Sequence, residues 1–410
     1  MSAAASIQLR VRPSLEEPPR PLVELVGRFD REVFDARQRV TRVRLEVIDR
    51  GTWDVLIREG VASLTAPAGT PDTLLSATEA AWRRIARDLH LAMDTYQAGR
   101  LRVRRNVHAG VGFLAATSND PGPGRLRFAS VATRGPRLSL VEAGTGPTVL
   151  ALHGLGATKS SFLSTVAALA DDFRVIAVDL PGFGDSDKPI GAAYDARFFA
   201  DAMIDLLDAL ELDRVHLLGN SLGGRIALEV GLSSPGRVSR IGLLAPSLAW
   251  RRGRPWQPLL RLVRPELGLL QLAPRPVVER FVRWLIPDAD DGWAAAGVDE
   301  FLRAYLTRSG RAAFYAAARH IYLDEPHGER GFWTRLATLK PPALFIWGRH
   351  DRLVPLAFAR HVAQTLPRAR QLELDCGHVP QIELPGPTHT ALCDFFAARS
   401  ASGVRTRMAG

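Results

Sequence analysis

The sequence predicts a large α/β domain with a mostly parallel sheet, a helical cap inserted into it, and a smaller α+β domain in front. Three observations lead to this fold class. From residue 127 on, short apolar runs alternate with helical patterns, and several runs are apolar throughout, as strands buried on both faces must be. Between Pro246 and about Thr338 this rhythm stops and helical patterns take over. Before residue 117, strand patterns come first and a helical pattern follows.

The first 116 residues are expected to form the small α+β domain. Alternating apolar and polar residues predict hairpin-like strands, and Ser76 and Glu79 have the spacing of a capping box at a helix start. The expected elements are strands at 43–47 and 53–57, a helix from the capping box to about residue 89, and a strand at 101–104.

Eight apolar runs predict the strands of the large sheet, at residues 127–133, 138–142, 148–152, 174–178, 215–218, 240–244, 343–347 and 371–374. In sheets built from βαβ units, ligands bind beyond the carboxyl ends of the strands. The inserted cap is expected to contain helices at 277–286 and 298–306, and the spacing of Phe281, Trp284 and Leu285 is typical of core packing.

Breaker residues between 117 and 125 mark the best domain boundary. We expect an α+β domain at 1–116, a linker at 117–125, an α/β core at 126–245 and 339–400, a helical cap at 246–338 and a disordered tail at 401–410.

The composition of the 410 residues indicates a globular protein without a metal centre. Residues 1–10 lack a basic stretch followed by an apolar one, and no apolar run is long enough to cross a bilayer, so a cytoplasmic location is expected. Cys376 and Cys393 fit a reducing compartment, and neither is expected to form a disulfide. No Cys/His cluster and no cofactor motif occurs, so we expect neither a metal nor a cofactor.

The net charge of +10 does not by itself indicate nucleic-acid binding. The chain has three lysines, and its fifty arginines are scattered without interleaved aromatic residues, so no nucleic-acid partner is expected. One local cluster, at 251–254 between Trp250 and Trp256, could contact anionic lipid surfaces.

The stretch 217–224 is an apolar strand that runs into a Gly-x-Ser-x-Gly turn. Such a turn holds a serine exposed between strand and helix, and small residues at Gly219 and Gly223 allow the two to pass closely. We therefore expect Ser221 to be a nucleophile. A serine hydroxyl needs a base and backbone N–H groups for the developing oxyanion.

These partners are found at the ends of other expected strands. The turn at His153 and Gly154 could present the N–H of Leu155 opposite the N–H of Leu222 as the oxyanion hole. The remaining two groups are Asp351, after the strand at 343–347, and His378, after the last strand. Their order, Ser then Asp then His, is the order expected of this kind of elbow, so His378 is the expected base and Asp351 the carboxylate that orients it. The loop at 179–187 is expected to be scaffold, its aspartates forming turns.

With these motifs, residues 125–400 resemble the α/β-hydrolase superfamily. The matching motifs are His-Gly at 153, Asp-Leu-Pro-Gly-Phe-Gly-Asp-Ser at 179, Gly-Asn-Ser-Leu-Gly-Gly at 219, Gly-Arg-His-Asp at 348 and Cys-Gly-His at 376. The resemblance implies an eight-stranded, mostly parallel sheet and the triad Ser221, Asp351 and His378, with Leu155 and Leu222 as oxyanion donors. The residues expected to contact substrate are His153, Gly154, Asn220, Trp250 and Val379.

Within the superfamily, the motifs look most like those of carbon–carbon hydrolases of meta-cleavage pathways and of esterases. The chain departs from the former at Val379, where those enzymes usually have an aromatic residue, and at 155–157, where they have Gly-Pro-Gly. The N-terminal region is similar to sterol carrier protein type 2 domains, which enclose an apolar tunnel for acyl or sterol ligands. The residues behind this likeness are Trp53, Gly60, residues 72–74 leading into a helix, and residues 98–103 opening the last strand.

Three functions fit these features. The first is an esterase or lipase-like hydrolase that forms an acyl-enzyme on a small apolar ester or acyl substrate, and it is the function we expect. The second is hydrolysis of a carbon–carbon bond of the meta-cleavage type by the same triad. The third is a lipid-binding or transfer protein with a vestigial hydrolase site. For residues 1–116, a dimerisation or packing role is an alternative to lipid binding, and the oligomeric state stays open.

Overall fold

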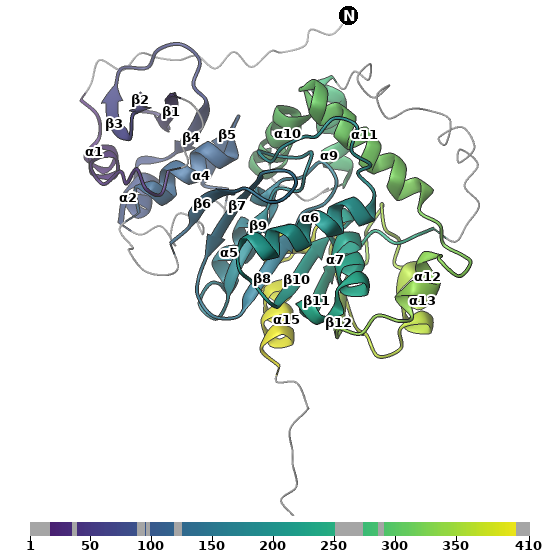
Figure 1. Ribbon diagram of the computed structural model, residues 1–410. Helices are drawn as coiled ribbons and strands as arrows, with labels where there is room; N and C mark the ends of the chain where they lie inside the picture. The colour runs from purple at the N-terminus through teal and green to yellow at the C-terminus, as the bar shows by residue number, and fades with distance from the viewer. Residues whose placement is uncertain are drawn as a thin grey trace, which may run out of the picture.

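The structure is a computed structural model that describes residues 17–34, 39–87, 95, 99–118, 125–250, 274–285 and 291–398. The expected tail at 401–410 and most of the expected linker lie outside the described residues. Figure 1 shows a smaller sheet with its helices beside a larger sheet, and the green cap helices next to both. The expected fold class, an α/β core with a cap and an added N-terminal α+β unit, is confirmed.

The larger sheet has eight strands in the order β13-β12-β11-β10-β8-β9-β7-β6. All eight apolar runs predicted from the sequence form strands. Neighbours from β13 to β9 pair in parallel, whereas β7 is antiparallel to both β9 and β6. The strands are β6 Arg127–Val131, β7 Leu138–Ala143, β8 Thr148–Leu152, β9 Arg174–Val178, β10 Val215–Asn220, β11 Val238–Leu244, β12 Ala343–Gly348 and β13 Arg370–Leu374.

Helices cover both faces of this sheet, which explains why inner strands such as β8 and β12 are buried along their whole length. Successive side chains of a strand point to opposite faces. In β8, Val149 and Ala151 pack in one apolar cluster, and Leu150 and Leu152 pack in the other. The first cluster includes α5 Leu163–Leu169 and α15 Pro385–Ala397, and the second includes α6 Ala196–Ala209, α7 Leu222–Ser233 and α13 Ala357–Thr365.

The N-terminal unit is built on a five-stranded sheet in the order β3-β2-β1-β4-β5. Its strands β1 and β4 pair in parallel, and the other neighbours are antiparallel. Its elements are α1 Arg20–Gly27, β1 Val40–Val47, β2 Gly51–Arg58, β3 Val61–Thr65, β4 Thr73–Ala77, α2 Glu79–Arg87, β5 Leu101–Arg104 and α4 Val107–Ala116.

The capping box expected at Ser76 is wrong, as is the helix expected after residues 72–74. That stretch forms β4, which pairs with β1, and the Ser76 hydroxyl is hydrogen-bonded to the carboxylate of Glu46 on β1. Helix α2 begins later, and Thr78 accepts the N–H of Ala81 at 3.3 Å. The short, buried strand β4 lies between β1 and β5 in the sheet. This long-range pairing outweighs the local capping pattern.

The cap lies between β11 and β12 in the chain. Its described helices are α9 Arg275–Leu285, α10 Asp291–Tyr305, α11 Arg308–Leu323 and the short α12 Phe332–Leu336. Ala313, Ala316 and Ala317 of α11 pack in the core cluster that also contains α7. Arg225 of α7 donates to Asp324, just after α11, at 2.9 Å. In the described part of the chain, no helix combines the length and apolar character needed to cross a membrane.

A buried chain of charges connects the core to the cap. The Lys159 ammonium, 2% exposed, contacts Asp179 at 2.6 Å and Asp185 at 3.3 Å. Arg303 of α10 binds the other oxygen of Asp185 at 2.6 Å and also pairs with Glu300. Burial would by itself raise the pKa of Asp179, but the charge and hydrogen bond of Lys159, together with the nearby His153, lower that pKa. Asp185 of the 179–187 loop therefore connects Lys159 of the core to α10 of the cap.

Replacing Lys159 by methionine is expected to lower the free energy of unfolding by about 3–5 kcal/mol, because Asp179 would stay buried without its cation. Urea denaturation of the full chain measures the change. Lys340→Met, at an exposed position, is the matched control and is expected to stay within about 0.5 kcal/mol. A loss for Lys159→Met no larger than for this control would contradict the structural role given to the network.

Candidate active site

The Gly-x-Ser-x-Gly segment forms a tight turn between β10 and α7. Ser221 has φ of 52° and ψ of −113°, a region that residues with a side chain rarely adopt. The close approach explains the flanking glycines. A Cβ at Gly223 would lie 1.9 Å from the carbonyl oxygen of Leu152, and one at Gly219 would lie 2.3 Å from the carbonyl oxygen of Gly223. The strained serine is therefore held at the carboxyl end of the sheet.

The end of β11 and the segment that follows it hold the backbone of Ser221. Its N–H donates to the carbonyl of Leu244 at 3.0 Å, and its own carbonyl accepts the N–H of Ser247 at 2.9 Å. Leu222 is the first residue of α7, where an α-helix leaves N–H groups without an intrahelical acceptor. Gly154 is so close that a Cβ there would lie 3.3 Å from Cβ of Ser221. The turn that carries Leu155 thus lies against the serine.

The structure brings Asp351 and His378 into direct contact. Oδ2 of Asp351 lies 2.8 Å from Nδ1 of His378, and both side chains are almost fully buried. The other oxygen of Asp351 accepts the N–H groups of Leu353 and Val354 at 2.8 and 2.9 Å. The carboxylate is thereby fixed by the loop after β12, and it leaves the second ring nitrogen of His378 for another partner.

Two further side chains fix the loop that carries His378. Glu383 accepts the N–H groups of Gly377 and Val379, one on each side of His378, both at 2.8 Å. Asn220 donates to the carbonyl of His378 at 3.1 Å and to that of Leu244 at 3.0 Å. Burial is the main cause that raises the pKa of Glu383. Sequence reasoning missed Glu383, because no motif singles out a carboxylate five residues after His378.

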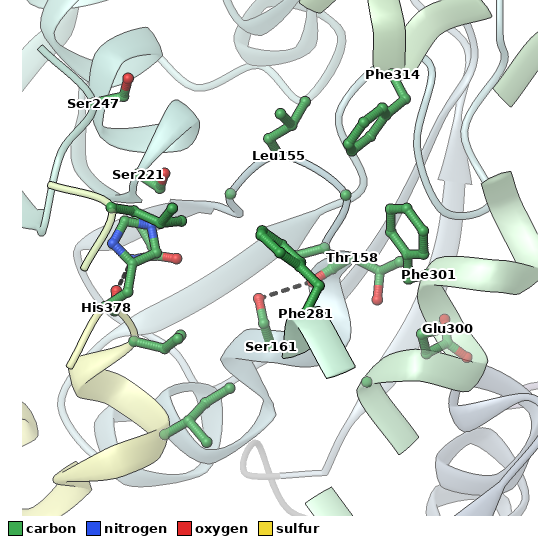
Figure 2. Close-up of a pocket in the computed structure, with 18 of the residues that line it drawn as sticks. Leu155, Thr158, Ser161, Ser221, Ser247, Phe281, Glu300, Phe301, Phe314 and His378 are labelled. Atoms are coloured by element: carbon green, nitrogen blue, oxygen red, sulfur yellow. Dashed lines mark hydrogen bonds between the residues drawn. The ribbon is translucent and has the colours of Figure 1, made fainter. Parts of the chain in front are cut away.

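Ser221 and His378 lie at one end of a cavity of about 640 Å³ between the core and the cap. Figure 2 shows the two side chains next to each other, with Glu300 on the opposite side of the cavity. Aromatic rings line the space between them, and Phe301 packs edge to face against Phe314 at 5.4 Å. The described lining is largely aliphatic and aromatic. Its charged members are His378, when protonated, and Glu300.

Four of the five residues expected to contact substrate line this cavity: Gly154, Asn220, Trp250 and Val379. The fifth, His153, does not reach it. Its ring is fully buried, with Nδ1 at 2.8 Å from the carbonyl of Gly154 and Nε2 accepting the N–H of Leu180 at 3.0 Å. Burial lowers the pKa of His153, so the neutral ring serves to connect the turns after β8 and β9.

The expectation that Phe281 and Trp284 are core residues is wrong. Both are exposed on α9, stacked on each other at 5.8 Å, and Phe281 also lines the cavity. Leu285, predicted with them, has a side chain outside the described residues. The arginine cluster at 251–254 and Trp256 also lie outside the described residues.

Comparison with known proteins places this arrangement in a family. The family described as alpha/beta hydrolase fold matches residues 147–385. 2-Hydroxymuconate semialdehyde hydrolase from Pseudomonas sp. (strain CF600) is 28% identical over 309 residues, which cover 71% of this chain and all of that protein. A bacterial membrane phospholipase A has a similar structure, with a TM-score of 0.57 and 26% identity over 75% of this chain and 94% of that one.

A meta-cleavage product hydrolase from Pseudomonas fluorescens IP01 shares the fold, with a TM-score of 0.54 and 23% identity over 65% of this chain and 97% of that one. The family match spans more than half of the chain, and the eight-stranded sheet, the elbow and the cap agree with it. The protein is therefore a hydrolase that belongs to the α/β-hydrolase fold family.

Proposed function

We propose that the protein hydrolyses esters of apolar acyl substrates through an acyl-enzyme on Ser221. The observation that carries this proposal is the cavity, whose aliphatic and aromatic walls lead to Ser221 and His378. Burial of each methylene of an acyl chain against such walls contributes about 0.8 kcal/mol. An apolar acyl group therefore has both a place to bind and a nucleophile at its carbonyl end.

In the proposed reaction, Oγ of Ser221 attacks the ester carbonyl while Nε2 of His378 takes its proton. Asp351, at 2.8 Å from Nδ1, fixes the tautomer and stabilises the imidazolium. The N–H groups of Leu155 and Leu222 would hold the oxyanion of the tetrahedral intermediate. His378 then protonates the departing alcohol, and a water molecule, deprotonated by the same ring, releases the acid and regenerates Ser221.

A second candidate is hydrolysis of a carbon–carbon bond with the same triad. It is favoured by the name of the relative from Pseudomonas sp. (strain CF600), a 2-hydroxymuconate semialdehyde hydrolase. The described lining argues for the ester instead, because it includes no lysine or arginine that could pair with the carboxylate of a dienoate. The name of the structurally similar phospholipase A also agrees with an acyl ester.

For the N-terminal unit we propose an acyl or sterol ligand, in keeping with its similarity to sterol carrier protein type 2 domains. The support from the structure is that the buried Trp53 on β2 and the buried residues of β1 and β4 give this unit an apolar interior. A protein that only binds or transfers lipid would have no need for the contact between Asp351 and His378 next to a strained serine. We therefore place the lipid role beside catalysis rather than instead of it.

A fluorophosphonate probe, which reacts with activated serines, is expected to label the protein at Ser221. Ser221→Ala should abolish both the label and ester turnover, and Ser247→Ala, which removes another hydroxyl lining the same cavity, should keep both. Asp351→Asn should lower kcat by a factor on the order of 10⁴, because the imidazole loses its orienting acceptor. Intact labelling of the Ser221→Ala protein would disprove the assignment.

The two candidate reactions are separated by their substrates. We expect turnover of p-nitrophenyl esters with kcat/KM rising from acetate to octanoate, since each added methylene is buried against the cavity walls. A coloured meta-cleavage dienoate is expected to be cleaved at least about 100-fold more slowly, because its carboxylate would be buried in a described lining that offers no lysine or arginine as a partner. Preference for the dienoate would reverse the proposal in favour of carbon–carbon hydrolysis.

Glu383 is expected to act as a positioning residue for His378. Glu383→Gln keeps the shape but offers one acceptor oxygen in place of two, so one of the two flanking N–H groups loses its partner. We expect kcat to fall about 10-fold with KM within 2-fold, as for an interaction that matters in the transition state. Glu383→Asp keeps both carboxylate oxygens as acceptors, so its kcat should fall less than that of Glu383→Gln. A change in KM alone would indicate a purely structural role. So would an equal loss of thermal stability and an equal fall in kcat in the two variants.

A further inference from the structure

The N-terminal unit is joined to the cap by a buried carboxylate. Asp299 of α10, with a side chain 4% exposed, accepts from Nε of Arg104 at 2.7 Å and from the N–H of Arg105 at 2.8 Å. On its other side it accepts from Arg275 of α9 at 2.7 Å. Figure 1 shows β5, which carries Arg104, next to α10. These contacts fix the first unit against the helices that cover the active site.

The same interface reaches the cavity through Glu300, the residue that follows Asp299 on α10. The N–H of Val107, at the start of α4, donates to Oε1 of Glu300 at 2.7 Å. Asn106 caps this helix by accepting the N–H of Ala109 at 3.0 Å, so the position of Val107 is set by secondary structure. Glu300 is held in turn by Arg303 at 3.0 Å. Val107 is therefore tied to a rigid part of the cap.

Val107 lies at the far end of the cavity from the nucleophile. Val107 is one of the residues that line the cavity, and at 3% exposure it is packed into the wall. Its bonding partner Glu300 is on the side opposite Ser221 and His378 in Figure 2. Figure 2 shows Phe281 between the two ends and Phe301 on the same side as Glu300. Within the described lining, Val107 is the contribution of the N-terminal unit.

We propose that the N-terminal unit closes the substrate cavity and that Val107 sets the length of the acyl chain the enzyme accepts. The proposal rests on the proposed ester hydrolysis at Ser221 and adds a specificity-determining residue from a different unit of the chain. A larger side chain at position 107 shortens the apolar channel from its far end. A smaller one extends it, because the backbone at this position is fixed by the cap of α4 and by Glu300.

The test is a series of p-nitrophenyl esters from acetate to dodecanoate on the full chain. Val107→Phe is expected to lower kcat/KM for octanoate and dodecanoate at least about 10-fold and to leave acetate within 2-fold, since single methylenes in an apolar pocket discriminate by such factors. Val107→Ala is expected to shift the preference toward longer esters. Val61→Phe, at an exposed position on β3 of the same unit, is the matched control. It should change neither kcat/KM for the long esters nor the preferred chain length.

Opposite shifts of the preferred ester length in Val107→Phe and Val107→Ala support the proposal. A merely structural role would lower kcat/KM for all esters by the same factor. An unchanged chain-length preference in both variants overturns it. A second measurement separates this outcome from failure of the ester hypothesis. In the Ser221→Ala protein, affinity for the methyl ester of a fluorescent polyene fatty acid is expected to fall at least about 10-fold with Val107→Phe. If the wild type cleaves no ester, the proposed function fails, and equal affinities in this binding series then overturn the role of Val107 as well.

Discussion

The site depends on one backbone constraint, the close passage of the β10–α7 turn over the end of β8. The gap between the Gly223 backbone and the carbonyl of Leu152 leaves no room for a side chain, and Ser221 takes a positive φ within that turn. Because β8 and β10 are adjacent and parallel, the turn after β8 is brought against the serine. The two backbone N–H groups assigned to the oxyanion hole therefore come from the same packing that strains the nucleophile.

The other two residues of the expected triad, Asp351 and His378, come from a different part of the sheet. Asp351 follows β12 and His378 follows β13, both farther along the sheet than β10. Asn220, the last residue of β10, bridges this distance through the carbonyl of His378, and Glu383 holds the loop from the other side. The nucleophile strand itself thus orients the loop that carries the base. This link gives Asn220 a role in geometry as well as in lining the cavity.

The sequence predicted the core well because its signals are local. Eight apolar runs correspond to eight strands, and the glycine-flanked Ser221 and the order of Asp351 and His378 could be found without a structure. The parts that were missed depend on contacts between distant segments. β4 pairs with β1 despite a helix-start pattern at Ser76, and Val107 meets Glu300 across 193 positions of sequence. No local periodicity encodes such contacts.

Buried charges add to the apolar packing that α11 provides for the cap, and they act mainly on α10. The cap's own described apolar cluster is small, formed by Val278, Val298 and Leu302 with Phe301 packed against it. Its position depends on Asp299, Glu300 and Arg303, which bind groups of the N-terminal unit and the core. A buried ion pair adds little net stability, yet displacing one partner leaves a charge unpaired, so such a network strongly disfavours other placements of the helix.

In this protein, the expected triad and the walls of the cavity have different roles, the first in bond cleavage and the second in the choice of substrate. A Ser-His-Asp triad can attack a carbonyl in an ester or in a carbon–carbon substrate, and the two reactions differ in the leaving group, an alcohol in one and a carbanion in the other. Discrimination must come from the walls that surround the rest of the substrate. Those walls are supplied by the cap and by Val107, whose positions depend on the buried charges of α10. In the proposed function, the N-terminal unit is part of the active site because Val107 belongs to the cavity wall on the side away from Ser221.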